Sequence, residues 1–174
     1  MAARLAILSL GSNTGDRLAW LKQAGLALLA LPESRLTAVS PVYESDPVGV
    51  PAGCRDLPFL NCVALLETGL GPHDLLAALG GIEAALGRTR GAEAGLPRTI
   101  DIDIVALGDL TLHTPTLTLP HPRAHLRRFV LQPLADVWPD CTLPDNTRTV
   151  ADLLRDIPLT PRVWPFDGSS SHLQ

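Results

Sequence analysis

Lysine is nearly absent from this chain of 174 residues. It occurs once, at Lys22, so thirteen of the fourteen basic residues are arginines. The phosphate-binding loop common in nucleotide-binding proteins requires the pattern G-x-x-x-x-G-K-[ST], which the sequence does not contain. If this protein binds a nucleotide, it therefore does so without the lysine of that loop.

Cysteines and long apolar runs are also scarce. The three cysteines, Cys54, Cys62 and Cys141, form no C-x-x-C pair, which argues against both a disulfide framework and a zinc site. No apolar stretch reaches the ~18 residues of a membrane span. The apolar run at residues 4–10 is too short for a signal peptide, and no A-x-A cleavage site follows it. We therefore expect a cytoplasmic protein without a membrane span.

The overall composition is that of a folded protein. Hydrophobic residues make up 46% of the chain and charged residues 18%, and the net charge is −4. These values exclude a disordered chain and argue against a surface that binds nucleic acid or membranes. We expect a single domain over residues 1–166, followed by a flexible C-terminal tail over residues 167–174.

Hydrophobic periodicity and turn residues predict an α+β domain. A proline-rich loop is expected at 46–58, between two of the strands. The expected strands are 4–10, 35–45, 59–68 and 98–107; the expected helices are 16–31, 72–86 and 149–156, with a shorter one near 123–128. The main elements follow the order β-α-β-β-α-β.

Two aspartates interrupt the apolar strand "RTIDIDIVAL". Because side chains alternate along a strand, Asp101 and Asp103 share one face, and the neighbouring isoleucines face the core. Two carboxylates on one face repel each other unless a cation lies between them. The pair is either an acidic patch on a solvent-facing strand or a Mg²⁺ site completed by water and phosphate oxygens.

Arginines cluster on both sides of this pair in the sequence. Six of them occur between positions 88 and 128: Arg88, Arg90, Arg98, Arg123, Arg127 and Arg128. A single arginine is usually an exposed surface charge. Several arginines beside two carboxylates are instead suited to a polyphosphate, because guanidinium groups bind its oxygens in pairs and the carboxylates hold its metal ion.

Two other polar residues stand out. Glu83 falls inside the apolar stripe of the 72–86 helix, where a carboxylate is costly unless it either pairs with an arginine or binds a polar ligand group. His121 and His125 have the spacing of a metal pair. The glutamate of H-E-x-x-H is missing and Pro122 disfavours a continuous helix, so zinc is not expected. His121 could instead contact phosphate.

Phenylalanine occurs only three times, which draws attention to Phe59 and Phe129. Either ring could belong to the core. Alternatively, the two rings could sandwich a flat heterocycle while Asn61 offers an amide edge for hydrogen bonds.

In chain order, the sequence contains "LSLGSN", "VSPVYESDPVG", "FLNCVALLET", "IEAALGRTR", "PRTIDIDIVALG" and "LTLPHPRAHLRRFVLQPL". With these motifs it resembles the 6-hydroxymethyl-7,8-dihydropterin pyrophosphokinases over roughly residues 4–156. The resemblance implies a three-layer αβα sandwich with a ferredoxin-like (βαββαβ) core and a mostly antiparallel sheet. It also implies transfer of the β,γ-diphosphate of ATP to the pterin hydroxymethyl group in folate biosynthesis, with release of AMP.

The resemblance further implies roles for individual residues. Asp101 and Asp103 would hold two Mg²⁺ ions, and Arg88 and Arg98 would act on the phosphates. The pterin would contact Ser45, Asp46, Val48, Phe59, Asn61 and Phe129. The nucleotide would contact Glu83, Arg90, Ile104, Thr118, His121 and Arg127. The expected partners are ATP and a small pterin, without nucleic acid or membrane, and the expected state is a monomer.

The chain departs from the family pattern in the loop before the aspartate strand. Ala94 and Gly95 stand where an arginine and an aromatic residue are frequent, and Thr116 replaces another arginine. We expect residues 87–97 to close over the ligands, but loosely. Two other functions remain open: a non-catalytic pterin- or nucleotide-binding module, and a different Mg²⁺-dependent phosphoryl or nucleotidyl transferase.

Overall fold

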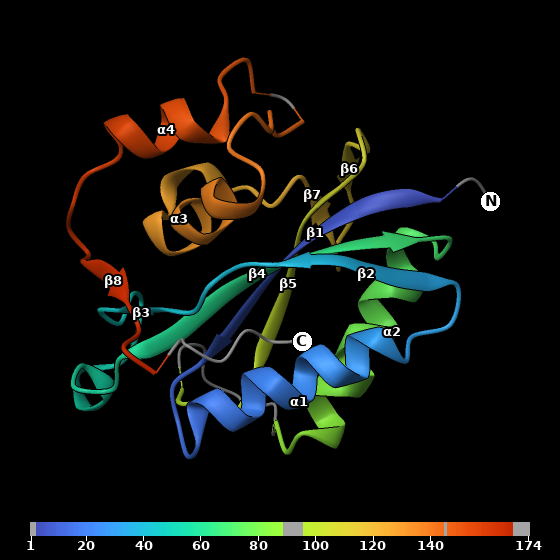
Figure 1. The fold of residues 1–174 in the computed structure, drawn as a ribbon. Coiled ribbons are helices and arrows are strands. Elements are labelled where there is room, and N and C mark those ends of the chain that lie inside the picture. Colours follow the sequence, from blue (N-terminus) through green and yellow to red (C-terminus); the bar gives the residue numbers. More distant parts are fainter. Residues whose placement is uncertain (1–2, 89–95, 145, 169–174) are drawn as a thin grey trace.

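The computed structural model describes residues 3–88, 96–144 and 146–168. A six-stranded antiparallel sheet lies between two layers of helices (Figure 1). Its strands are β1 (Arg4–Ser12), β2 (Ser34–Val39), β3 (Tyr43–Ser45), β4 (Phe59–Thr68), β5 (Asp101–Leu107) and β8 (Val163–Pro165). The helices are α1 (Arg17–Leu29), α2 (Pro72–Ala85), α3 (Arg128–Val137) and α4 (Val150–Asp156). A small hairpin joins β6 (Leu112–His113) to β7 (Thr118–Leu119).

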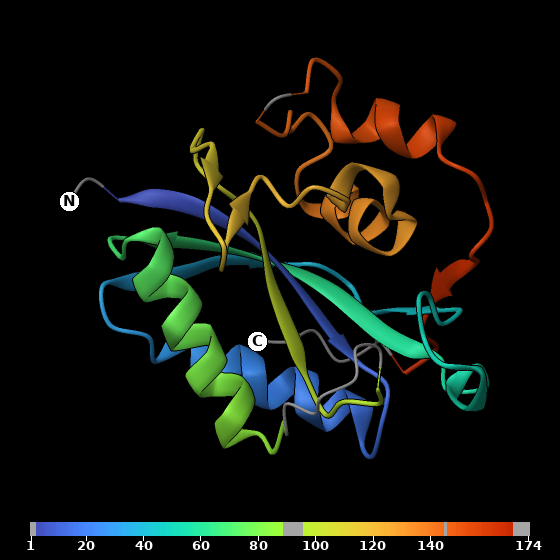
Figure 2. The same ribbon diagram turned by 180° about the vertical axis from the view of Figure 1, so that it is seen from behind.

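The strand order confirms the expected ferredoxin-like core. Strands β5, β1, β4 and β2 lie side by side, and each neighbouring pair is antiparallel. Helix α1 connects β1 to β2, and α2 connects β4 to β5, so both helices cover the same face. Helices α3 and α4 cover the other face, which completes the three-layer αβα sandwich (Figure 2).

Local sequence signals account for the first two helices. The carboxylate of Asp16 accepts a hydrogen bond from the backbone N–H of Ala19 (3.0 Å), as expected of an N-cap residue. Helix α2 begins at Pro72, whose fixed φ and missing N–H suit the first helical position. Both helices therefore begin where the sequence predicts.

The sheet separates two apolar cores, because alternate side chains of its central strands point to opposite faces. Leu8 and Leu66 pack with the α1 and α2 side, whereas Ile7 and Val63 pack with Leu131 and its neighbours on the α3 side. The middle of β4 is consequently buried on both faces, and its sequence "CVALL" is continuously apolar.

Two predictions about secondary structure were wrong, and one strand was missed. The strand expected at 35–45 is two strands, β2 and β3, separated at Ser40, whose N–H and hydroxyl both bond to Val63. The short helix expected near 123–128 is a 3-10 turn, Ala124–Leu126, followed by the longer helix α3. Strand β8 was not expected at all.

Across the described ranges, none of the helices is both long and apolar enough to cross a membrane. The tail expected at 167–174 lies largely outside the described residues, which end at 168.

Candidate active site

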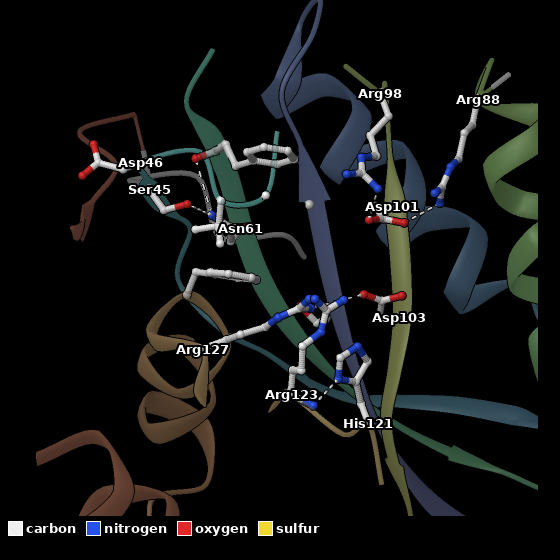
Figure 3. A pocket seen from close by; sticks show the side chains of 16 residues that line it. Ser45, Asp46, Asn61, Arg88, Arg98, Asp101, Asp103, His121, Arg123 and Arg127 are labelled. Atoms are coloured by element: carbon white, nitrogen blue, oxygen red, sulfur yellow. Dashed lines mark hydrogen bonds and ion pairs between the residues drawn. The ribbon is translucent and has the colours of Figure 1, made fainter. Parts of the chain in front are cut away.

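A cavity of about 430 Å³ opens on the α3 side of the sheet, near the end of β1 and the start of β4 and β5 (Figure 3). Most of the residues predicted for the site line it. They are Ser45, Asp46, Val48, Phe59, Asn61, Arg88, Arg98, Asp101, Asp103, His121, Arg127 and Phe129. The chain therefore brings residues far apart in sequence to one site.

Strand register explains why a pocket forms at this position. On the α3 side of the sheet, β1 presents Ile7, then Ser9, then Gly11, so its side chains become smaller and more polar towards the pocket. Ser9 pairs with Asp103, and Gly11 pairs with Asp101. The same face therefore changes from apolar core to polar pocket floor along the strands.

The alternation predicted for β5 is confirmed. Ile102 and Ile104 are each 4% exposed and lie in the core under α2, whereas Asp101 and Asp103 line the cavity. The irregularity in β1–β5 pairing falls next to Ile104, beyond the aspartates. Both carboxylates consequently point to the same side (Figure 3).

Asp101 is held between two arginines. Arg98 Nη1 donates to its Oδ2 (2.7 Å), and Arg88 Nη1 donates to its Oδ1. Burial alone would lower the pKa of Arg88, but the charges of Asp101 and Glu83 outweigh it and raise the pKa. Arg88 therefore stays charged, and the negative charge of Asp101 is neutralised locally.

Asp103 is less well compensated. Burial raises the pKa of its carboxyl group and the charge of Asp101 raises it further, while His121, Arg127 and Arg88 oppose the shift. Arg127 forms an ion pair with Asp103, but its Nη1 lies 4.0 Å from Asp103 Oδ2. A further cation beside Asp103 would stabilise its ionised form.

His121 is oriented by its neighbours. Its backbone N–H donates to the carbonyl of Val105 (2.8 Å), and its Nδ1 accepts the backbone N–H of Arg123 (3.1 Å). Nδ1 is therefore the unprotonated nitrogen of the neutral ring, and the proton is on Nε2. Burial lowers the pKa of His121, which favours this neutral form.

Two arginines lie close together beside His121. Burial lowers the pKa of Arg127, and the positive charge of Arg123 lowers it further. The Arg127 guanidinium also lies over the ring of Phe129, 5.4 Å from its centroid. Adjacent positive charges in a pocket favour an anionic ligand. Arg123 belongs to the arginine cluster of the sequence, but no role was predicted for it.

The end of the cavity away from the aspartates is made by β3 and β4. Asn61 is 3% exposed, and its Nδ2 donates to the hydroxyl of Ser45 (2.9 Å), which fixes the orientation of the amide (Figure 3). The Phe59 ring lines the cavity here and lies 5.8 Å from the guanidinium of Arg98. Aromatic and amide groups therefore lie next to the charged groups.

Glu83 supports the site from behind it. The side chain is buried, and its Oε1 accepts the backbone N–H of Ile102 (2.8 Å) and the guanidinium of Arg88. The arginine-pairing interpretation is therefore confirmed. Glu83 fixes both the β5 backbone between the two aspartates and the arginine that binds Asp101, but it does not line the cavity.

Several predicted nucleotide contacts do not line the described cavity. Ile104 is in the core, and Thr118 lies on β7. Arg90, and Ala94 and Gly95 of the expected closing loop, lie outside the described residues.

Asn13 positions Arg98, a role that was not predicted. Asn13 Oδ1 accepts the backbone N–H of Arg98 (2.8 Å), and the backbone N–H of Asn13 donates to the Arg98 carbonyl (3.2 Å). Asn13 is 2% exposed, although asparagine is usually exposed. The sequence places Asn13 just after a strand, but its burial is visible only in the structure.

The two aspartates are suitable ligands for Mg²⁺. Within the described ranges, no three acidic, histidine or cysteine side chains form a complete metal cage. Mg²⁺ does not require one, since it commonly binds one or two carboxylates and takes its other ligands from water and substrate phosphates. Two carboxylates facing an arginine-lined cavity fit that pattern.

Known proteins with similar sequences point to one family. The family model described as 7,8-dihydro-6-hydroxymethylpterin-pyrophosphokinase (HPPK) matches residues 7–139. A protein of Pseudomonas aeruginosa named 2-amino-4-hydroxy-6-hydroxymethyldihydropteridine pyrophosphokinase is 45% identical over 161 residues, covering 92% of this chain and 91% of its own. A protein of the same name from Bacillus subtilis is 42% identical over 160 residues, covering 92% and 90%.

Solved structures support the same fold. The Plasmodium falciparum HPPK-DHPS structure with pteroate has a TM-score of 0.67 and 16% identity over 88% of this chain. The present chain spans 42% of that longer chain, so the likeness concerns the shared fold alone. The family match and the relatives of similar length establish that this chain belongs to the 7,8-dihydro-6-hydroxymethylpterin-pyrophosphokinase family.

Proposed function

We propose that this protein transfers the β,γ-diphosphate of ATP to the hydroxymethyl group of 6-hydroxymethyl-7,8-dihydropterin, with release of AMP, in folate biosynthesis. The observation that carries the proposal is a single cavity with two different ends. One end has aromatic rings and a fixed amide, and the other has two carboxylates among arginines. This combination suits a flat heterocycle placed next to a polyphosphate.

The aromatic end would bind the pterin. Phe59 and Phe129 offer ring surfaces for stacking, and Asn61 offers an amide edge whose orientation is already set by Ser45. Because Asn61 is buried, its polar atoms favour a ligand that can hydrogen-bond with them. A pterin has both the flat surface and the polar edge that this end requires.

The charged end would bind the triphosphate. Asp101 and Asp103 would hold Mg²⁺, which neutralises phosphate charge when it is bound. Arg88 and Arg98 now pair with Asp101, and Arg127 lies 4.0 Å from Asp103. A metal-bound nucleotide would give the arginines phosphate oxygens to bind in place of the aspartates. Arg123 lies close enough to take part.

The reaction then requires positioning more than covalent chemistry by the protein. The hydroxymethyl oxygen forms a bond to the β-phosphorus and loses its proton to water. The bond from that phosphorus to the α–β bridging oxygen breaks, and AMP leaves with that oxygen. The pterin end fixes the attacking oxygen, and the arginines stabilise charge on the transferred group. The neutral His121, with its proton on Nε2, can donate a hydrogen bond to a phosphate oxygen.

The finer predictions belong to this proposal as well. We propose two Mg²⁺ ions per active site, a monomer, and a cytoplasmic location. Sedimentation equilibrium would test the monomer. Titration of the ATP complex with Mn²⁺, followed by electron paramagnetic resonance, would count the metal ions.

AMP formation from ATP and Mg²⁺, with and without 6-hydroxymethyl-7,8-dihydropterin, tests the proposed function. We expect AMP only when the pterin is present, in a one-to-one ratio with the diphosphorylated pterin. AMP formation independent of the pterin would favour a different transferase. Pterin and ATP binding without any AMP would favour a non-catalytic binding module.

A further inference from the structure

Four consecutive residues at the pterin end are each anchored to a different part of the protein. The Tyr43 hydroxyl donates to Asp136 of α3 (2.6 Å). Glu44 accepts Arg17 of α1 (2.7 Å), and Ser45 accepts Asn61 of β4 (2.9 Å). The fourth residue, Asp46, is bound by Arg162, which lies near the C-terminal end of the described chain. Ser45 and Asp46 line the cavity themselves.

The contact between Asp46 and Arg162 consists of several hydrogen bonds. Arg162 donates its backbone N–H (3.0 Å) and Nε (3.1 Å) to Asp46 Oδ2, and its Nη2 (3.2 Å) to Oδ1. In return, the backbone N–H of Asp46 donates to the carbonyl of Arg162 (3.1 Å). The guanidinium also lies 5.5 Å from the ring centroid of Trp164. A two-point side-chain contact combined with backbone bonds fixes orientation as well as distance.

Strand β8 continues this attachment along β3. Val163 pairs with Ser45, and Pro165 pairs with Tyr43. The backbone N–H of Phe166 then donates to the carbonyl of Val42 (3.1 Å). Residues 162–166 therefore run along the whole of the segment that leads into the cavity wall. This C-terminal strand lies beyond residue 139, where the match to the family model ends.

The direction of the Asp46 side chain shows what the contact does. Its carboxylate points away from Asn61 and the cavity centre (Figure 3). The same carboxylate accepts the hydrogen bonds of Arg162. Asp46 is thus held by its carboxylate on the outer side, while the following residues Val48 and Gly49 line the cavity. Gly49 has φ +66°, so the chain turns sharply directly after this anchor.

We propose that Arg162 is a positioning residue for the pterin, which fixes the wall segment 45–49 through Asp46 and thereby sets pterin affinity without affecting ATP. This inference rests on the proposed function, since it assumes that a pterin occupies this end of the cavity. Arg162 does not line the cavity, and its guanidinium donates to Asp46, so we expect its effect to pass through that carboxylate.

The test is the dissociation constant of 6-hydroxymethyl-7,8-dihydropterin, measured by calorimetric titration of Arg162→Ala. We expect it to rise roughly fivefold, the upper end of the effect of losing a well-formed exposed ion pair. The KM for ATP and the kcat at saturating pterin should stay within about twofold. Arg162→Lys, which retains the charge and loses the two-point contact, should fall between wild type and Arg162→Ala.

Arg35→Ala is a matched control. The Arg35 side chain is 75% exposed, as is that of Arg162, and it also pairs with a carboxylate, Glu67, but far from the cavity. Its loss should leave pterin affinity unchanged. If Arg162 acts through Asp46, then adding Arg162→Ala to Asp46→Ala should cause no further loss.

Unchanged pterin affinity in Arg162→Ala, or losses that simply add in the double variant, would overturn the inference. A wild-type protein that binds the pterin but forms no AMP would overturn the proposed function and leave this inference intact. A wild-type protein that binds no pterin would overturn both.

Discussion

The two ends of the cavity differ in how their polar groups are satisfied. At the pterin end, Ser45, Asn61 and Asp46 are bound to protein partners of suitable geometry. At the phosphate end, Asp101 and Asp103 share one face, and Asp103 has its nearest arginine 4.0 Å away. Protein contacts hold the side chains of the pterin end in place, whereas the phosphate end has charges that are only partly compensated.

This difference indicates how the two substrates would be recognised. A wall whose shape is fixed in advance can select a heterocycle by fit, and loses little entropy when the ligand binds. The carboxylates and arginines held close together at the phosphate end instead favour a ligand that neutralises their charges. A metal–triphosphate complex does so. We therefore expect substitutions at the two ends to have separable effects.

The largest expected effect is at the phosphate end. Asp101→Asn and Asp103→Asn should each lower the turnover number by roughly a thousandfold or more, since a catalytic metal ion stabilises transition-state charge by several kcal/mol. The dissociation constant of the pterin alone should not change, because its site is at the other end. AMP assays and calorimetry on the same preparations would measure both. Near-wild-type AMP formation would contradict the metal assignment.

At the pterin end we expect a smaller effect, on the affinity for pterin. Phe59→Ala and Phe129→Ala should each weaken pterin binding by about 1–3 kcal/mol, the range measured for stacking of bases on aromatic side chains. Asn61→Ala should have a comparable cost, because buried polar groups would lose their partner. Calorimetric titration gives the affinities.

Phe129→Leu is the control for these ring variants, since it keeps apolar bulk and removes the aromatic face. It should recover part of the affinity lost in Phe129→Ala. Unchanged affinity in all three alanine variants would place the pterin elsewhere and break the comparison between the two ends.

A substitution behind the cavity separates support of the site from contact with ligands. Glu83→Gln should lower the free energy of unfolding by about 1–3 kcal/mol, because a buried charge-assisted contact to Arg88 is lost. Urea denaturation measures this change. Glu67→Gln, in the exposed pair with Arg35, should cost less than about 1 kcal/mol. Equal losses in both variants would argue that Glu83 is not a specific support.

The smallest expected effect is a pH dependence of stability without metal. The pKa of Asp103 is raised in the folded protein, so the folded state holds its proton to higher pH than the unfolded chain. This contribution to stability is present below the unfolded pKa and is lost as pH rises through the raised pKa. The Asp103 side chain is still 46% exposed, which keeps the effect small.

Asp103→Asn should remove this part of the pH dependence and leave the metal-free protein slightly more stable at neutral pH. Thermal unfolding in chelator between pH 3 and 7 would measure it. Mg²⁺ with ATP should reverse the order and stabilise the wild type more than the variant. If the thermal stability of both proteins depends on pH in the same way, the folded state does not raise the pKa of Asp103, contrary to this prediction.

Local signals in the sequence were sufficient for much of the fold and the charged end. The strand predicted at 59–68 is β4 to the residue, because a largely apolar run is bounded by Pro58 and Gly69. The alternation around Asp101 placed both carboxylates on one face, since a strand has a period of two. Glu83 was detectable because it broke an otherwise regular apolar stripe.

Features that depend on distant contacts could not be predicted in this way. Strand β8 has three residues, and it exists because it pairs with β3, more than a hundred residues earlier. Helix α3 was missed although it carries Phe129, because Pro133 lies inside it and proline usually ends a helix. Arg162 resembled an ordinary surface charge until the fold placed it against Asp46.

The burial of β4 on both faces has a consequence for inhibition. Phe59 and Asn61 begin the strand whose next residues fill both apolar cores. A change that shifts this part of the backbone would disturb packing on both sides of the sheet. Point mutations should therefore rarely give resistance to a compound that fills the pterin site and contacts strand β4 itself. Resistance should arise instead at Val48, which is exposed and lies on a loop.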